Sequence, residues 1–330
     1  MSISFLVTIA TLALVFSMGS MLLNVESSWG GMWDLGIAGQ IAVGAYTYAL
    51  LTGPPDSAVP GFDLPILAGM IGAAVVVGVV STVIGWPALR LRGEYFLITT
   101  FAFAEILRQL IVIRKDVTGG TFGITSVKKP FAETFTFEAY PYVMLGLTLV
   151  LALVVWALCT RLGNSAYGLT LRAARDNEAL AQSMGTSISA IRISTYAAVG
   201  AMCGFFVAPA YVWFLGALVP SIFVSSLTFT IWTGLVIGGL GSKAGPLLGA
   251  LVLTIGSEMI RLVEVSPEHA QIISAFHPLL VGLLLIGVLR WRPGGLISER
   301  TSFTRSRARL ASASATSETD RTPSAQTGSL

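Results

Sequence analysis

Two ionisable residues stand inside an otherwise apolar run. Glu105 and Arg108 lie three residues apart in the segment 94–113, and this spacing places both on one face of a helix. Ionisable groups are costly inside a membrane, so they are usually paired and face protein or a water-filled cavity. We therefore expect an ion pair that either pins two helices together or lines a polar pathway. Thr99 and Thr100 can serve either arrangement by bonding across helices.

The residue types that an enzyme or a metal site needs do not come together in this sequence. His269 and His277 are the only histidines, and neither has a cysteine near it. Residues 238–243 read GGLGSK, which lacks the spacing of a phosphate-binding loop and lies between apolar runs. Cys159 and Cys203 also lie in or beside apolar runs, where we interpret them as small core residues rather than a disulfide. We expect no catalytic residue, no metal, no cofactor and no enzymatic activity.

Charge gathers instead in the segment 169–185, LTLRAARDNEALAQSMG, between two apolar runs. Its charged residues are Arg172, Arg175, Asp176 and Glu178. Alanine, leucine, arginine and glutamate favour a helix, and the first three charges share one face of it. Gly185 is placed to end the helix. The pattern fits either a helix lying at the membrane interface or a rigid knob that another protein contacts.

Glycines punctuate two other stretches. The first, ESSWGGMWDLGIAGQIAVGAY, includes Gly36, Gly39 and Gln40 and follows directly on an apolar run. Because glycine weakens helices and lets backbones approach closely, a broken or re-entrant helix is expected here. The second, TGGTFGI, contains Gly119 and Gly120 and predicts a tight loop, although a plain turn is the alternative.

The elements that position these residues follow from composition. Of the 330 residues, 54% are hydrophobic and only 11% are charged, whereas a soluble chain carries about 25% charged residues. Several runs reach the ~20 residues that a helix needs to cross a bilayer. We predict an all-α, polytopic membrane protein with about eight to ten transmembrane helices. The predicted spans are 3–24, 35–52, 65–86, 94–113, 141–160, 193–215, 222–240, 246–262 and 272–289.

The distribution of arginine and lysine predicts the orientation. If the segment 161–192 is cytoplasmic, alternate crossing places most of these residues on the same side, as the positive-inside rule requires. The chain then divides into a transmembrane domain, 1–297, and a tail, 298–330, whose Ser- and Thr-rich composition predicts disorder. We expect the C-terminus to be cytoplasmic. Without an arginine or lysine before the first apolar run, the N-terminus lacks the pattern of a signal peptide.

Taken in order, five stretches resemble the LivM-type membrane subunit of ABC importers for branched-chain amino acids. They are LNVESSWGGMWDLGIAGQIAVGAYTYALL, LRLRGEYFLITTFAFAEILR, TGGTFGI, YGLTLRAARDNEALAQSMG and GGLGSKAGPLLGAL. The resemblance as a whole covers roughly residues 23 to 292. Asp34 departs from the family pattern, as do Thr121 and Phe122 in the glycine loop. Relatives with a similar scaffold are assigned to urea or other amides, so both solute classes stay open.

The resemblance implies the permease fold of an ABC importer, placed in the bacterial inner membrane. It implies a second permease subunit, two cytoplasmic ATPase subunits, an external solute-binding protein and the lipid bilayer as partners, with no nucleic acid. It also identifies Arg172, Arg175, Asp176, Glu178 and Gly185 as the part that couples to an ATPase. We place Gly36, Gly39, Gln40, Thr99, Thr100, Glu105 and Arg108 along the translocation pathway, and Gly119 and Gly120 in a periplasmic loop. The alternative from another class is an ion-coupled secondary transporter, which is disfavoured because Glu105 is nearly alone among buried carboxylates.

Overall fold

The computed structural model describes residues 3–57, 59–91, 93–132, 134–136 and 138–261, with scattered positions from 279 to 297. Among the described residues, six helical stretches are long and apolar enough to cross a membrane. They contain α1 Ile3–Asn24 with the π-helix η1 Val25–Trp29, α3 Ile66–Ala88, α4 Glu94–Ile113, α6 Tyr140–Asn164, α9 Ile188–Met202 with η2 Cys203–Val207 and α10 Ala208–Leu215, and α11 Ser225–Gly238. Two more apolar helices, α2 Ile37–Thr52 and α12 Gly245–Arg261, are shorter. The polytopic all-α prediction is confirmed. Eight of the nine predicted spans match these elements, and 272–289 lies outside the well-described part.

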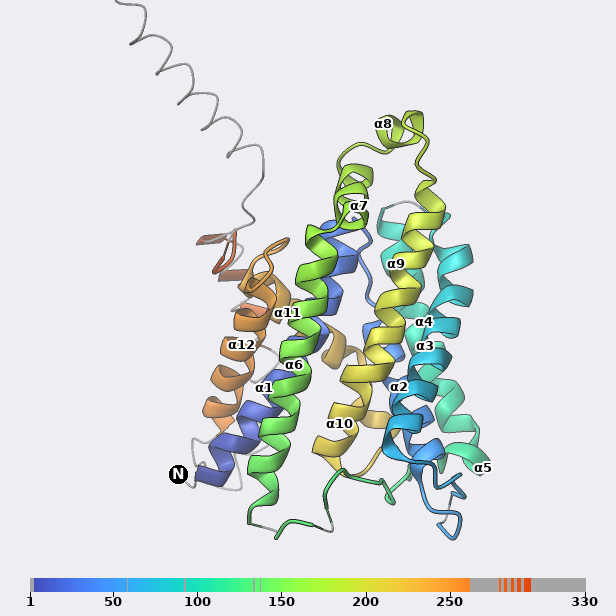
Figure 1. The fold of residues 1–330 in the computed structure, drawn as a ribbon, viewed down its shortest axis with the longest axis vertical. Coiled ribbons are helices and arrows are strands. Elements are labelled where there is room, and N and C mark those ends of the chain that lie inside the picture. The colour runs from blue at the N-terminus through green and yellow to red at the C-terminus, as the bar shows by residue number, and fades with distance from the viewer. Residues whose placement is uncertain are drawn as a thin grey trace, which may run out of the picture.

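Short helices lie between these apolar helices. They are α5 Lys115–Thr118, α7 Ala166–Asp176, α8 Glu178–Ser183 and the 3₁₀ turn η3 Pro220–Ile222. Figure 1 shows α7 and α8 at one end of the bundle, while the chain starts at the opposite end. The described residues form no strand, although Ile124 and Leu218 pair in one isolated antiparallel bridge near that opposite end.

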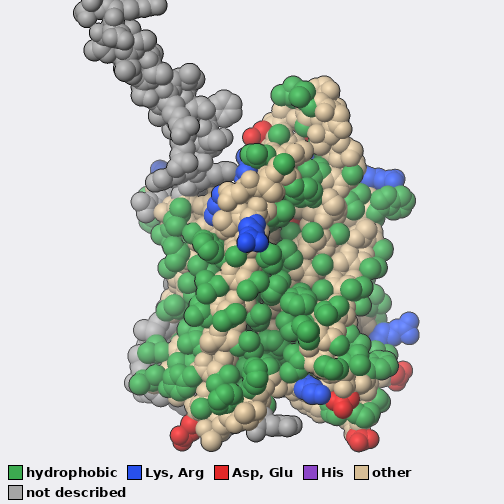
Figure 2. Space-filling model, in the orientation of Figure 1, with side chains coloured by type: hydrophobic (Ala, Val, Ile, Leu, Met, Phe, Trp, Pro, Cys, Tyr) green, Lys and Arg blue, Asp and Glu red, His purple; other side chains and the backbone are tan. Residues whose placement is uncertain are grey.

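α1 forms the centre of the bundle. In the stretch formed by α1 and η1, 72% of the most apolar part is buried, whereas only 17% of the most apolar part of α4 is buried. Small residues let other helices approach α1 closely. The Ser17 hydroxyl donates to the carbonyl oxygen of Leu247 at 3.0 Å, and the Ser20 hydroxyl to that of Ile231 at 2.8 Å. Such bonds satisfy polar groups where no water reaches them. The outer helices expose apolar side chains instead, and Figure 2 shows hydrophobic side chains covering most of one face.

The first membrane helix is broken from the second, as the glycines predict. α1 continues as the π-helix η1, and residues 30–36 then form a non-helical connection before α2 begins at Ile37. Gly31 in this connection has a φ of 68°, a left-handed conformation that glycine adopts without strain. α2 then runs back toward the end of the bundle that lies opposite α7 and α8 (Figure 1). The connection is therefore a turn inside the bundle, held by the neighbouring helices.

Candidate functional site

The charged segment forms a knob, which we call the lever, comprising residues 165–187. Its first helix, α7, begins where the Ser165 hydroxyl accepts a hydrogen bond from the backbone of Gly168 at 3.2 Å. We predicted one helix through to Gly185, and this is wrong. The chain breaks at Asn177, which has an extended backbone and whose side chain caps α8 by accepting from the backbone of Leu180 at 3.0 Å. Asparagine competes with the helical backbone in this way, so it favours a cap over a helix interior.

The two arginines of the lever reach inward to the end of the first membrane helix. The Arg172 guanidinium donates to the Gly163 carbonyl oxygen at 2.6 Å and lies 5.5 Å from the ring centre of Trp29. The Arg175 Nη1 atom donates to the carbonyl oxygen of Ser28. We had expected both arginines on a common charged face with Asp176. Only Asp176 is largely exposed, while Arg175 pairs with it and also contacts η1.

The remaining charge of the lever ties it to the next span. Glu178 on α8 forms an ion pair with Arg192 on α9, which closes the lever against the start of that helix. Between them Gly185 adopts a φ of 84°, and nothing within 4 Å would meet a side chain there. Gly185 is therefore required for its backbone conformation, two residues after α8 ends, and not for close packing.

The outer surface of the lever is apolar at its prominent positions. Leu169, Leu180 and Met184 are 59%, 62% and 80% exposed. Its inner side is packed, with Ala174, Ala181 and Ile188 forming a small core of their own. The lever therefore exposes large apolar side chains, although its sequence is charged.

The predicted pathway residues fall into two groups. Gly36 begins α2, and the backbone N–H of the preceding Leu35 donates to the Thr100 hydroxyl on α4 at 3.1 Å. A side chain at Gly39 would meet the Cα atom of Ala104 at 2.8 Å, so glycine lets α2 pack directly against α4. Gln40 is 4% exposed, and its amide has no hydrogen-bond partner in the described structure. These four residues lie around the start of α2.

The other group lies on α4 and does not join this cluster. Thr99 bonds to the Tyr95 carbonyl of its own helix at 2.7 Å, so the predicted bond across helices belongs to Thr100 alone. Glu105 and Arg108 form the expected ion pair, in which Arg108 Nε lies 2.9 Å from Glu105 Oε2. The Glu105 side chain is 44% exposed, so the pair lies on the surface of this subunit.

Sequence reasoning missed two carboxylates that belong with the first group. Glu26 on η1 and Asp34 in the connection are both fully buried, and their side chains interact electrostatically. Neither forms an ion pair with any described lysine or arginine, and both oxygens of Glu26 lack a hydrogen-bond partner. Asp34 Oδ1 accepts from the Gly36 backbone at 2.8 Å. The available signal was an acidic residue on each side of a glycine pair at the end of an apolar run.

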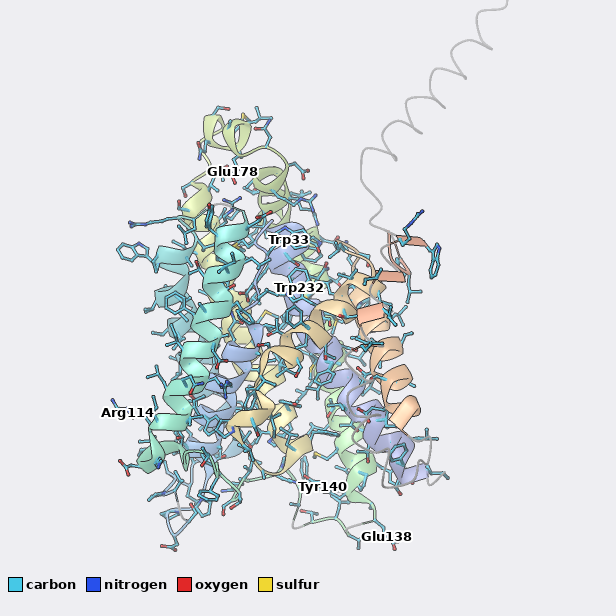
Figure 3. All side chains as sticks on the ribbon, turned by 180° about the vertical axis from the view of Figure 1, so that it is seen from behind. Trp33, Arg114, Glu138, Tyr140, Glu178 and Trp232 are labelled. Carbon is cyan, nitrogen blue, oxygen red and sulfur yellow. The ribbon has the colours of Figure 1, made fainter. Side chains whose placement is uncertain are left out.

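The glycine loop lies at the end opposite the lever. Gly119 and Gly120 have φ values of 73° and 59°, which confirms a tight turn. The loop is anchored where Ile124 and Leu218 exchange backbone hydrogen bonds of 2.9 and 2.8 Å. Figure 3 shows the same separation from behind, with Glu178 at one end of the molecule and Arg114 toward the other.

The described residues hold no group of three or more His, Cys, Asp or Glu that could bind a metal ion. Cys159 and Cys203 are both buried and free, as expected of core residues. Residues 238–243 are part of the packing, because the Asn24 side chain accepts from the Gly241 backbone and donates to the Ser242 carbonyl, both at 2.9 Å. That loop therefore packs against the end of α1.

Comparison with known proteins identifies the family. The family model described as "Branched-chain amino acid transport system / permease component" matches residues 5–289. The high-affinity branched-chain amino acid transport system permease protein LivM of Escherichia coli (strain K12) is 30% identical over 318 residues, which cover 88% of this chain and 69% of that protein. A probable LivM of Methanocaldococcus jannaschii is 28% identical over 83% of this chain and 82% of its own length, and a probable LivH of the same organism is 27% identical over 61% and 63%. No solved structure matches. The chain belongs to the permease component family of branched-chain amino acid transport systems, as a LivM-type permease subunit of an ABC importer.

Proposed function

We propose that this subunit imports leucine, isoleucine and valine and is driven by ATPases that grip the lever. The proposal rests on two properties of the lever, the exposure of its outer side and the contacts of its inner side. Its outer positions are apolar and exposed, while Arg175 donates a hydrogen bond to the Ser28 carbonyl oxygen of η1 and Arg172 lies over the ring of Trp29. A partner that moves the outer surface therefore pulls on the end of the first membrane helix through Arg175 and Ser28. Arg172, Asp176, Glu178 and Gly185 give this connection its shape.

The partners proposed are a second permease subunit, two cytoplasmic ATPase subunits and an external solute-binding protein. The similarity of this chain to proteins named LivM and LivH supports a pair of related permeases. The face of α4 that carries Glu105 and Arg108 is the surface we assign to the second permease. An exposed ion pair is unfavourable against lipid tails, and protein or a water-filled pathway relieves that cost.

The solute pathway is proposed to run past the start of α2, where Gly36, Gly39, Gln40 and Thr100 lie. Broken helices near the middle of a membrane are common at transporter binding sites, because their free backbone groups can bind solute. ATP binding would draw the ATPases together, move the lever and tilt the helices joined to it. The pathway would then open alternately to the two sides of the membrane.

The lever side is proposed to be cytoplasmic in the inner membrane. The start of α1 then faces outward, and the loop with Gly119 and Gly120 meets the external binding protein. We propose 1–297 as the permease domain and 298–330 as a cytoplasmic tail. The tail lies outside the described residues, so its position rests on the charge distribution alone.

Uptake by the reconstituted complex tests this function. The subunit is placed in vesicles with its second permease, ATPases and binding protein, and import of labelled leucine is measured with ATP inside. Unlabelled valine should compete with leucine, whereas urea should not. Competition by urea and not by valine would assign the complex to amides. Uphill uptake by the purified subunit without any ATPase would overturn the whole proposal in favour of a secondary transporter.

A further inference from the structure

A cavity of about 560 Å³ lies beneath the lever. Arg175, Glu178 and Arg192 border it on the lever side. Ser28 and Trp33 border it on the side of η1 and the connection to α2. Figure 3 shows Glu178 on the outer side of this region and Trp33 deeper in the molecule. Its volume falls in the range of small-molecule sites, about 300–1,000 Å³.

The polar lining carries charge of both signs. Arg175 and Arg192 bring two guanidinium groups to the border of the cavity, and Glu178 brings a carboxylate. Arg192 Nη2 pairs with Glu178. Hydrogen bonds between guanidinium and carboxylate groups are among the strong ones in proteins. Guanidinium groups beside a carboxylate side chain fit a molecule that carries both a carboxylate and an ammonium group.

The rest of the wall is apolar. Met32, Leu89, Leu91, Phe96 and Leu240 line the cavity together with the ring of Trp33. An aliphatic side chain of the ligand would be removed from water against these groups, which contributes about 25 cal/mol per Å² of apolar area. A sugar, a nucleotide or a polyanion would leave this wall without a matching surface.

We propose that this cavity binds a small aliphatic α-amino acid from the lever side, the product that the importer releases. Its carboxylate pairs with the guanidinium groups of Arg175 and Arg192, its ammonium group pairs with Glu178, and its side chain lies on the apolar wall. The identity of this ligand rests on the proposed function, whereas the existence of a site rests on the cavity alone.

The position of the cavity gives binding a consequence. Its walls belong both to the lever and to the membrane core, so a ligand in it bonds to both at once. A lever tied to η1 through a ligand resists the displacement that the ATPases must produce. Because the ligand favours one of two lever positions, it shifts the population toward that position. High product on the lever side would therefore slow ATP hydrolysis.

The test uses the complete permease–ATPase complex in nanodiscs, without the solute-binding protein. ATP hydrolysis and binding of radiolabelled leucine are measured as leucine is raised. Leu91→Trp places a bulkier group in the apolar wall, and Leu67→Trp at the far end of α3 is the matched control, since both leucines are exposed, by 44% and 61%. We expect leucine to slow hydrolysis of the wild type. Leu91→Trp should raise the half-inhibiting concentration at least about tenfold.

The outcomes separate this inference from the proposed function. If leucine inhibits Leu91→Trp and the wild type at the same concentration, it acts elsewhere and the cavity proposal is wrong. If leucine neither binds nor slows hydrolysis while the complex still imports it, the import function stands and the cavity proposal fails. A hydrolysis rate that depends on anionic phospholipid, with Leu91→Trp removing that dependence, would assign the cavity to a lipid and overturn it as well.

Discussion

The ring of Trp33 stacks on the ring of Trp232, with centroids 5.4 Å apart and planes 8° from parallel. The indole N–H of Trp232 also donates to the Asp34 carbonyl oxygen at 2.7 Å. Trp33 precedes α2 in the connection, and Trp232 lies in α11, so this contact joins two helices about 200 residues apart in the chain. Figure 3 shows the two side chains close together, nearer to the lever than to the opposite end of the molecule.

We expect Trp232→Phe to lower the thermal stability of the subunit while leaving the stack in place. The change removes the indole N–H and leaves the buried Asp34 carbonyl without that partner, which costs about 1–3 kcal/mol. Thermal unfolding in detergent measures the loss. Trp86→Phe is the control, because Trp86 is 60% exposed on α3. Equal melting temperatures for the two variants would show that the bond contributes no stability.

Gly39→Ala should separate α2 from α4. The added methyl group would lie 2.8 Å from the Ala104 Cα atom, and backbone cannot move aside as a side chain can. Overpacking of this kind costs about 1–3 kcal/mol. Gly146→Ala on α6 is the matched control, since nothing lies within 4 Å of its new methyl group. There alanine should raise helix stability by up to about 1 kcal/mol. The melting temperatures should move in opposite directions, and a loss in both variants would contradict the packing argument.

Glu26→Gln should leave the complex assembled and as stable as the wild type, or more so. Glu26 and Asp34 are both buried, and glutamine keeps the shape of glutamate while removing a carboxyl group whose charged form is costly to bury. Glu94→Gln is the exposed control, from the first turn of α4. The melting temperature and uptake rate of both variants are measured. Loss of uptake by an intact Glu26→Gln complex would instead show that the carboxyl group itself takes part in transport.

The sequence predicts the spans well because apolar content alone decides them. The predicted span 94–113 coincides with α4, and 246–262 differs from α12 by one residue at each end. The first span was predicted to end at 24, but the helix continues through η1 to Trp29. A run of Glu, Ser and Ser has the composition of a helix end. This run stays inside the bundle because the neighbouring helices and the loop 238–243 cover it. No local sequence pattern predicts that these distant segments cover the run.

The sequence also could not predict in which direction the side chains of the lever arginines point. Spacing places Arg172 and Arg175 on a common face, but whether that face points to solvent or to η1 depends on how α7 leaves α6. Likewise, Asn177 could continue a helix or cap a new one, and the surrounding contacts decide between them. Of the seven residues predicted to line the pathway, four lie around the start of α2 and Glu105 pairs with Arg108 as expected. A role in the pathway stays a prediction for all seven.

The lever gives the most direct functional prediction. Replacing Arg175 and Glu178 together with alanine should uncouple ATP hydrolysis from uptake without unfolding the subunit. Arg175 holds the lever to the Ser28 carbonyl, and Glu178 holds it to Arg192 on α9. Without both contacts an ATPase can still bind the apolar outer positions, but its motion is no longer passed to the membrane helices. Hydrolysis should continue while uptake falls at least about tenfold, since two partly buried charged contacts are lost.

The measurement compares hydrolysis and uptake in the same vesicles, with Lys115→Ala and Asp116→Ala together as the control, since they also remove one positive and one negative charge, at the far end of the bundle. Binding of the ATPases to the double variant is checked by co-purification, because a lever that no longer folds would lose its partners. Normal uptake by an assembled Arg175→Ala, Glu178→Ala complex would mean that force reaches the membrane helices by another route. Loss of both hydrolysis and ATPase binding would assign these residues to docking rather than to transmission.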